Sequence, residues 1–369
     1  MTENGVPERG TATENRVPER DGVTGEIAYL SFTARGRELS EVLRAALGGE
    51  ASCTRDVSLA RWTAENFPYR RALVYVGAVG IAVRAIAPYL RSKATDPAVV
   101  AVDECGRFAV PLASGHLGGA NELARKIAAL TGGTAVITTA TDLRGVFAVD
   151  EWARRHDCAV IHPTEIKSVS GKLLAGGTVR FYTAFPVDGA PPDGVELITP
   201  NPPPDGAEVS DTPDGVKILD TSPDVWLDVH RHPPLSLSPR VLVLGVGCRR
   251  GTAPETLERR FSALCEHYDL WPDAFAAAAT IDLKADEPGL LAFCAAHGWE
   301  LHTFRADELR QVPGTFTASA FVARRTGVEN VCERAAVLLS KGELLVRKRA
   351  GEGVTFAVAR RPVRLDWSW

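Results

Sequence analysis

The stretch Ser114-Gly115-His116-Leu117-Gly118-Gly119-Ala120-Asn121-Glu122-Leu123 joins an apolar run at 108–112 to a helix-forming run at 121–130. This pattern predicts a strand, a tight turn and a helix that begins at the glycines. Glycines let the backbone approach a ligand closely, and the unpaired amides of a first helical turn favour an anion. His116 is the side chain of this turn that can exchange a proton near neutral pH. The turn is therefore either a ligand site or simply the connection between two elements.

Alternating apolar and helical runs surround this turn and predict an α/β domain over residues 26–142. Residues 103–106, between two apolar runs, are typical of a hairpin turn. We therefore expect a largely parallel sheet that contains one antiparallel hairpin. Strands are expected at 27–32, 73–76, 98–102, 107–112 and 135–137, and helices at 37–47, 57–67, 79–90 and 121–130.

Changes in composition divide the rest of the 369-residue chain. Residues 1–25 hold a near-duplication with few large apolar side chains, which predicts a disordered tail. Prolines and glycines between short apolar runs predict a small β-rich middle domain at 143–232, with one of its strands at 216–219, followed by a proline-rich linker at 233–239. A second α/β domain is expected at 240–361 and a tail at 362–369. The predicted fold is thus two α/β sandwich domains joined by a smaller β-rich middle region.

Composition excludes several classes of protein. The formal net charge is −4, so the overall charge does not favour nucleic acid or an anionic membrane surface. No apolar run reaches the ~18 residues that span a bilayer, and the N-terminus lacks a signal-peptide core, so we expect a cytoplasmic protein. The 7 cysteines are scattered without Cys-x-x-Cys spacing, which argues against disulfides and zinc ribbons. His230-x-His232 shows no acidic or thiol partner, so no metal site is expected there.

Polar turns at the ends of predicted strands are the remaining candidates, because open α/β sheets bind ligands at such ends. The sequence contains no dinucleotide fingerprint, phosphate loop, serine-hydrolase elbow or His-Glu-x-x-His motif, so nucleotide cofactors are not expected. Asp142 and Asp282 suit helix capping as well as chemistry. Arg249 and Arg250 suit either a solvated surface or bidentate carboxylate recognition. The candidates are His116, Asn121, Glu122, Thr139, Thr141, Asp142, Arg249, Arg250, Asp282 and Lys284.

Several longer motifs resemble the CbiG family, the cobalt-precorrin-5A hydrolases of cobalamin biosynthesis. In the N-terminal half they are VGIAVRAIAP at 79–88, KATDPAVV at 93–100, SGHLGGANELA at 114–124 and ITTATD at 137–142. In the C-terminal half they are GVGCRRGT at 245–252, TIDLKADEPGLL at 280–291 and VCERA at 331–335. The resemblance extends over about residues 27–360, is looser in the middle region, and leaves out both ends of the chain.

The resemblance implies a reaction on a cobalt-bearing, ring-contracting tetrapyrrole. Water opens a lactone between the ring A acetate and the meso carbon C20, and the two-carbon unit built from C20 and its methyl group leaves as acetaldehyde. The substrate carries the cobalt, so the protein itself is expected to need no cofactor and no metal of its own.

The same resemblance suggests roles for the candidate residues, because lactone opening needs a base or acid and donors that stabilise an oxyanion. His116 is the candidate base or acid, and Asp142 would orient the histidine or the water. The amides of Gly118 and Gly119 would donate to an oxyanion or a carboxylate. Carboxylates of the macrocycle would be bound by Arg249, Arg250, Lys284 and Arg84, with Asn121, Glu122 and Asp282 as further candidates for substrate contact.

Two other functions stay open at this point. The chain could be a non-catalytic tetrapyrrole-binding or carrier component of the same pathway, with both glycine turns as carboxylate clamps. A sugar-phosphate or nucleotide-phosphate enzyme is disfavoured by the missing phosphate loops. Transient contact with other pathway enzymes and a homodimer are both compatible with the sequence.

Overall fold

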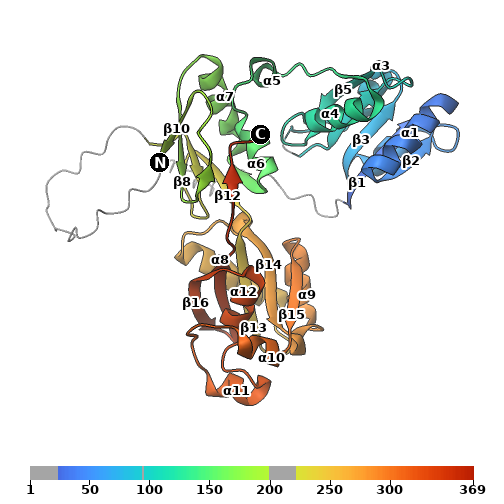
Figure 1. The fold of residues 1–369 in the computed structure, drawn as a ribbon. Helices are drawn as coiled ribbons and strands as arrows, with labels where there is room; N and C mark the ends of the chain where they lie inside the picture. The colour runs from blue at the N-terminus through green and yellow to red at the C-terminus, as the bar shows by residue number, and fades with distance from the viewer. Residues whose placement is uncertain (1–23, 94, 199–221) are drawn as a thin grey trace, which may run out of the picture.

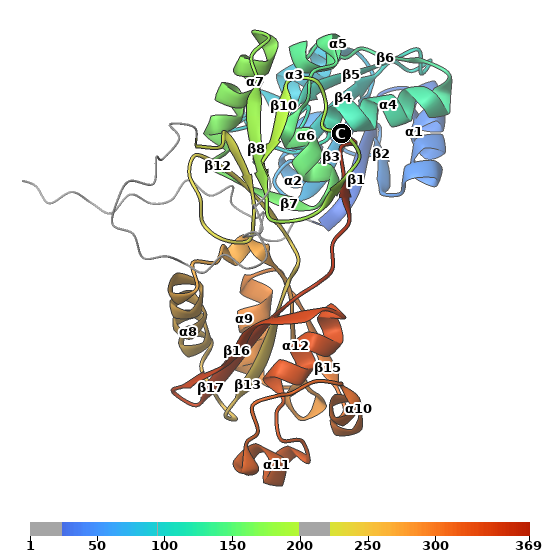
Figure 2. The same ribbon diagram turned by 60° about the vertical axis from the view of Figure 1, so that its left-hand side comes forward.

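The computed structural model describes residues 24–93, 95–198 and 222–369, which form three units around three main sheets (Figures 1 and 2). The α/β fold class is confirmed. The tail expected before residue 24 and the strand expected at 216–219 lie outside the described residues, although Thr24 and Gly25, which we assigned to that tail, begin the first strand. Within the described ranges, no helix has the length and apolarity needed to cross a membrane.

The N-terminal unit is one sheet with helices on both faces. Its elements are β1 Thr24–Ser31, α1 Ala34–Leu47, β2 Glu50–Cys53, α2 Leu59–Asn66, β3 Arg70–Val76, α3 Val79–Ile86, β4 Ala98–Val102, β5 Phe108–Ala113, α4 Ala120–Thr131 and β6 Thr134–Ala135. The strand order is β2-β1-β3-β4-β5-β6. Strands β1 to β4 are parallel and β5 is antiparallel to β4, so the predicted hairpin is confirmed. Helices α1 and α4 pack on one face, and α2 and α3 on the other.

The direction of β5 determines where the glycine turn lies. Strand β6 is parallel to β5, and both run opposite to β1–β4. Their carboxyl ends therefore lie at the edge of the sheet where the other four strands begin. Ser114, the first residue of the turn, donates its hydroxyl to the carbonyl of Asp96, just before β4 (2.9 Å). The turn after β5 and the segment after β6 consequently meet at this edge.

The middle unit is a five-stranded sheet in the order β10-β8-β11-β12-β7, with β7 antiparallel to its neighbour. Its elements are α5 Ala140–Arg144, α6 Val149–Arg155, β7 Cys158–Ile161, α7 Ile166–Leu174, β8 Val179–Thr183, β9 Val187–Asp188, β10 Val195–Ile198, β11 Val225–Leu227 and β12 Leu235–Pro239. Helices α6 and α7 contribute buried Trp152, Ile166 and Val169 to its core.

The expected linker at 233–239 is wrong, because Leu235–Pro239 forms strand β12. All five of its residues are buried, and the strand pairs in parallel with β11 and antiparallel with β7. The alternation Leu-Ser-Leu-Ser is a strand pattern that the flanking prolines obscured. These prolines stand before the strand and at its last position, where they do not interrupt its pairing.

The C-terminal unit is a five-stranded sheet in the order β15-β14-β13-β17-β16. Its elements are β13 Leu242–Cys248, α8 Pro254–His267, β14 Phe275–Ile281, α9 Pro288–Ala296, β15 Glu300–Phe304, α10 Ala306–Gln311, α11 Ala320–Thr326, α12 Cys332–Ser340, β16 Glu343–Gly351 and β17 Val354–Arg360. Strands β13, β14 and β15 are parallel, and the hairpin of β16 and β17 is antiparallel to β13. Helices α8 and α9 share one apolar core with the middle unit, whereas α10 and α12 cover the other face.

The last residues return to the middle unit, so the expected tail at 362–369 is also wrong (Figure 1). Strand β18 Leu365–Asp366 pairs with β9, and Trp367 is only 7% exposed. The indole of Trp152 donates to the carbonyl of Asp366 (2.7 Å). The C-terminal unit is therefore inserted between β12 and β18 of the middle unit.

Candidate active site

The glycine turn is built so tightly that glycines are required. A Cβ on Gly118 would lie 2.4 Å from the Cβ of Ser114, and Gly119 is the N-cap of α4 with a φ of 81°. The backbone of the turn also caps the helix: the amides of Gly119, Ala120 and Asn121 donate to the carbonyls of residues 116, 114 and 115 at 2.9, 3.1 and 3.0 Å. These amides are thus already bonded in this conformation, and an oxyanion would have to displace a carbonyl to reach them. The turn thus positions His116 and engages the amide of Gly119, whereas the donor role expected for the amide of Gly118 stays a prediction.

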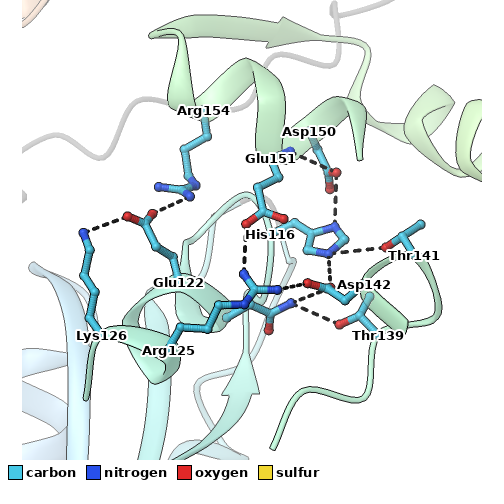
Figure 3. A network of polar contacts seen from close by, with 11 residues as sticks. His116, Glu122, Arg125, Lys126, Thr139, Thr141, Asp142, Asp150, Glu151 and Arg154 are labelled. Carbon is cyan, nitrogen blue, oxygen red and sulfur yellow. Dashed lines mark hydrogen bonds and ion pairs between the residues drawn. The ribbon is translucent and has the colours of Figure 1, made fainter. Parts of the chain in front are cut away.

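His116 lies between two carboxylates from different segments (Figure 3). Its Nε2 is 2.8 Å from Oδ2 of Asp142 on α5, and its Nδ1 is 3.1 Å from Oδ1 of Asp150 on α6. Burial lowers the pKa of the imidazole, but the hydrogen bonds and charges of Asp150 and Asp142 outweigh burial and raise the pKa of His116 to about 9. At neutral pH the ring is therefore an imidazolium that donates to both carboxylates.

Three side chains donate to the carboxylate of Asp142, namely those of His116, Asn121 and Arg125. Asn121, which is buried, donates Nδ2 to Oδ2 of Asp142 (3.0 Å) and to the hydroxyl of Thr139 (3.1 Å). Arg125 forms an ion pair with Oδ1 of the same carboxylate. Burial raises the pKa of Asp142, but the contacts with His116 and Arg125 lower it more, so the carboxyl group is ionised. The predicted pairing of His116 with Asp142 is thus present in the structure.

Ion pairs continue from the N-terminal unit into α6 of the middle unit (Figure 3). Arg125 also pairs with Glu151 (3.3 Å), and Glu122 pairs with Arg154 (2.5 Å) and with Lys126 (2.7 Å). The sequence did not identify Arg125, Asp150, Glu151 or Arg154 as site residues. Their segments are ordinary amphipathic helices, and only the docking of α6 against α4 makes them part of the site.

A cavity of about 600 Å³ adjoins this cluster between α4, α5 and α6. Such a volume is within the usual range of small-molecule sites, about 300–1,000 Å³. Asp142 and Glu151 line the cavity, as do three arginines. The remaining lining comes from Glu122, from α5 and the segment after it, and from Trp369 at the end of the chain. The lining residues are Glu122, Arg125, Thr141, Asp142, Gly145, Val146, Ala148, Glu151, Arg154, Arg155 and Trp369.

Among the residues that the structure describes, one group of side chains has donor atoms close enough together to hold a metal ion. His116, Asp142 and Glu151 each place one donor atom within 4.8 Å of the others, but Arg125 already bridges the two carboxylates and supplies a positive charge there. We also expected no acidic partner for His230 and His232. This was wrong, because Asp228 accepts from both rings at 3.1 and 3.0 Å. The absence of a metal requirement stays a prediction.

The candidates from the C-terminal unit lie at the carboxyl ends of β13 and β14, as predicted. Arg249 and Arg250 are exposed, and Asp282 and Lys284 lie in a short 3₁₀ turn after β14. Lys284 is paired with buried Glu287 (2.9 Å), which also accepts from the amide of Gly251. Glu287 therefore ties the two turns together, a role that the sequence did not suggest.

This second group is separate from the His116 cluster. Strand β13 follows β12 almost directly, so its amino end adjoins the middle unit and its carboxyl end points away from that unit (Figure 2). Arg84 is exposed on α3, on the sheet face opposite α4. Among the described residues, no hydrogen bond or ion pair connects Arg84 or Arg249 with His116. The structure thus brings together His116, Asn121, Glu122 and Asp142, but not the basic residues predicted to complete their site.

The fold and this cavity define an α/β protein of three units with a histidine–carboxylate site between two of them. Two family models match the chain: "Cobalamin synthesis G N-terminal" at residues 61–142 and "Cobalamin synthesis G C-terminus" at residues 242–359. The chain therefore belongs to the cobalamin synthesis G (CbiG) family, as the motifs indicated. His116 and Asp142 lie within the N-terminal match, whereas Asp150, Glu151 and Trp369 lie in segments that neither model covers.

Two relatives that match most of the chain carry the same name. The cobalt-precorrin-5A hydrolase of Salmonella typhimurium is 34% identical over 305 residues, covering 82% of this chain and 86% of its own. The cobalt-precorrin-5A hydrolase of Priestia megaterium is 31% identical over 309 residues, covering 80% of each chain. A solved structure of CobE, a protein from the cobalamin (vitamin B12) biosynthetic pathway, is 30% identical, covers 32% of this chain and 89% of its own, and has a TM-score of 0.31.

Proposed function

We propose that this protein is a cobalt-precorrin-5A hydrolase and that its chemistry takes place at the cavity beside His116. The observation that carries the location is the imidazole held between Asp142 and Asp150 at 2.8 and 3.1 Å, beside a cavity of about 600 Å³. The reaction itself is supported by relatives of that name that cover at least four fifths of the chain.

The proposed reaction has two stages. Water adds to the lactone carbonyl, and the bond between that carbon and the ring oxygen breaks, which leaves a carboxylate on ring A and an alkoxide on C20. The alkoxide then becomes the carbonyl of acetaldehyde as the bond from C20 to the macrocycle breaks. The electron pair of that bond stays on the macrocycle, which takes up a proton. The substrate brings the cobalt, and we propose that no further cofactor takes part.

His116 acts as a proton donor in this proposal rather than as a base. Its pKa of about 9 keeps it protonated at neutral pH, and a protonated imidazole can stabilise the developing alkoxide or protonate the macrocycle. Asp142 and Asp150 orient the ring and keep it charged. Asp142 and Glu151, two of the three carboxylates that line the cavity, are placed to receive a proton from the attacking water.

The basic turn of the C-terminal unit has another place in this proposal. The predicted contacts for substrate carboxylates at this second position are Arg249, Arg250 and Lys284, with Asp282 beside them. Arg84 remains a predicted carboxylate contact at a third position on the molecule. We further propose a cytoplasmic protein that binds neither nucleic acid nor membranes, meets other pathway enzymes transiently and forms a homodimer.

Substitution of His116 tests the proposed chemistry. We expect His116→Ala to lower acetaldehyde release from the cobalt lactone by about 10²–10⁴-fold, the usual contribution of a positioned acid or base. The released aldehyde would be measured with purified full-length protein, at a protein concentration lower than that of the substrate. Asp150→Asn should lower the rate less, because Asp142 still holds the ring.

His297→Ala is the matched control, because His297 also pairs with a carboxylate, Glu258, at 2.7 Å but lies in the C-terminal unit. Its rate should equal that of the unmodified protein. Near-normal release by His116→Ala would remove this histidine from the chemistry. Stoichiometric binding of unchanged pigment by the unmodified protein, without aldehyde, would instead support the carrier function.

A further inference from the structure

The end of the chain is firmly held against the middle unit. Besides the pairing of β18 with β9, the side chain of Asp366 accepts from the amide of Ser368 (2.7 Å) and lies 3.4 Å from Nε2 of His156. Trp367 packs among Phe147 and Phe181, with ring centroids 5.9 and 5.3 Å away. Because residues 365, 366 and 367 are each held in this way, the position of residue 369 is also defined.

That residue, Trp369, lines the cavity beside His116. Its ring meets Phe147 edge to face, with centroids 5.5 Å apart and planes at 82°, and it is only partly buried. The indole is thus packed against the middle-unit core, and Trp369 also borders the cavity. An aromatic ring with this exposure offers a flat apolar surface to a planar ligand.

Arg155 borders the same cavity at the end of α6. Arg125 and Arg154 are already paired with carboxylates of the protein, whereas Arg155 is exposed and makes no ion pair with any described residue. A guanidinium in this state can bind an incoming carboxylate without breaking an existing pair. The cavity therefore combines one free cation with one aromatic wall.

We propose that this cavity binds one carboxylate-bearing edge of a planar tetrapyrrole, with the macrocycle against Trp369 and a carboxylate on Arg155. The proposal rests on the proposed function for the identity of the ligand. It assigns a binding role to Arg155, which lies between the two matched family segments at 61–142 and 242–359, and to Trp369, which lies after the second. The macrocycle is larger than the cavity, so the rest of it extends out of the cavity.

Binding of two cobalt corrinoids to the full chain tests this assignment. The probes are cobyrinic acid, whose side chains are free carboxylates, and its fully methylated ester. We expect Trp369→Ala to weaken binding of the acid about tenfold and Trp369→Phe to weaken it less, because stacking on an aromatic ring is worth about 1–3 kcal/mol. Arg155→Ala should weaken binding of the acid about tenfold but leave binding of the ester unchanged.

Arg325→Ala is the control, because Arg325 is also exposed in the last turn of a short helix but lies on α11. It should bind both probes like the unmodified protein. Unchanged affinity in both Trp369→Ala and Arg155→Ala, with unaltered thermal unfolding, would overturn the proposal. Failure of the proposed function is seen separately, as absence of acetaldehyde from the unmodified protein, and does not alter the corrinoid binding result.

Discussion

The charge on His116, in the N-terminal unit, depends on two carboxylates from helices α5 and α6 of the middle unit. Asp142 belongs to the segment that leaves the N-terminal sheet, and Asp150 to the first turn of α6. Each carboxylate accepts from one ring nitrogen, so neither nitrogen is free to act as a base while the ring is protonated. The imidazolium therefore links two units, and it gives a proton to the substrate only when one of these two hydrogen bonds breaks.

The raised pKa of His116 predicts a specific loss of stability in alkali. A group whose pKa rises from 6.5 in the unfolded chain to about 9 in the fold stabilises the fold fully below pH ~6.5, and this contribution is lost as the pH rises through 9. The loss is on the order of 3 kcal/mol. Urea unfolding at several pH values should show this decline in the unmodified protein and not in His116→Asn.

His297→Asn is the comparison for this measurement and should keep the alkaline decline. If His116→Asn declined with pH as steeply as the unmodified protein, the two carboxylates would not hold a proton on this ring. The same titration can be followed directly, because the ring protons of His116 should shift near pH 9 in a magnetic resonance spectrum.

The sequence predicted half of this site for a physical reason. His116 and Asp142 follow two neighbouring parallel strands, β5 and β6, so the rule that strand ends meet at one edge was sufficient for them. Asp150 and Glu151 are adjacent on a short helix of another unit, and no local pattern records the docking that places them. Arg249 also follows the carboxyl end of a strand, but in a different sheet. The rule therefore predicted residues of two sites without showing that the sites are separate.

Glycines of the C-terminal motifs allow a strand and a helix to approach very closely. A Cβ on Gly245 in β13 would lie 1.9 Å from the carbonyl oxygen of Cys332 on α12, and a Cβ on Gly289 in α9 would lie 1.9 Å from the carbonyl oxygen of Thr252. Buried Glu333 then accepts from the backbone amides of Thr317 and Lys348, both at 2.7 Å. The motifs shared with the family thus include packing and loop attachment as well as chemistry.

A methyl group on Gly245 should destabilise the C-terminal unit. We expect Gly245→Ala to lower its free energy of unfolding by about 3 kcal/mol, because α12 must move away from β13. Gly171→Ala is the control, since Gly171 is exposed on α7 and an added Cβ there meets no atom within 4 Å. That change should stabilise the protein by up to about 1 kcal/mol. Equal urea midpoints for the two variants would contradict the close approach.

Elements with a clear period were predictable, and those interrupted by proline were not. The strands at 98–102 and 107–112 and their hairpin turn follow directly from alternating apolar runs and a polar turn. β12 was missed because prolines were taken as the sign of a linker, although a proline at the last position of a strand costs little pairing. The role of 362–369 depends on Leu365 and Trp367 finding a partner sheet far away in sequence, which no local pattern shows.

The three units are joined in two different ways. The middle and C-terminal units share one continuous apolar core, whereas the cores of the N-terminal unit are separate from it. Leu117 of the glycine turn packs against the shared core, and the other described links from the N-terminal unit include the ion pairs around His116. The Arg125–Glu151 and Arg154–Glu122 pairs are partly exposed and therefore weak and screened by salt, whereas the His116–Asp150 pair is buried. Because the N-terminal unit shares no continuous apolar core with the other two units, it is the part best able to move.

Loss of these ion pairs should expose the connection between the units. We expect the double variant Asp150→Asn, Glu151→Gln to be cleaved by trypsin after Arg144 several times faster than the unmodified protein, because this exposed residue ends α5, the first helix after the N-terminal unit. Added salt should act in the same direction on the unmodified protein. Glu343→Gln, which removes an ion pair to Arg360 within the C-terminal unit, should leave the cleavage rate unchanged. Equal rates in all three proteins would show that ion pairs do not hold the N-terminal unit in place.

The insertion of the C-terminal unit between β12 and β18 has a consequence for synthesis on the ribosome. The N-terminal unit can fold as it emerges, since its strands and helices are contiguous in sequence. The sheet of the middle unit is made next, but Leu365 and Trp367 reach it only after the whole inserted unit has been translated. Until then Phe147, Trp152 and Phe181 of the nascent middle unit are uncovered. We expect a chaperone to bind at this stage of translation, when the most apolar surface is exposed.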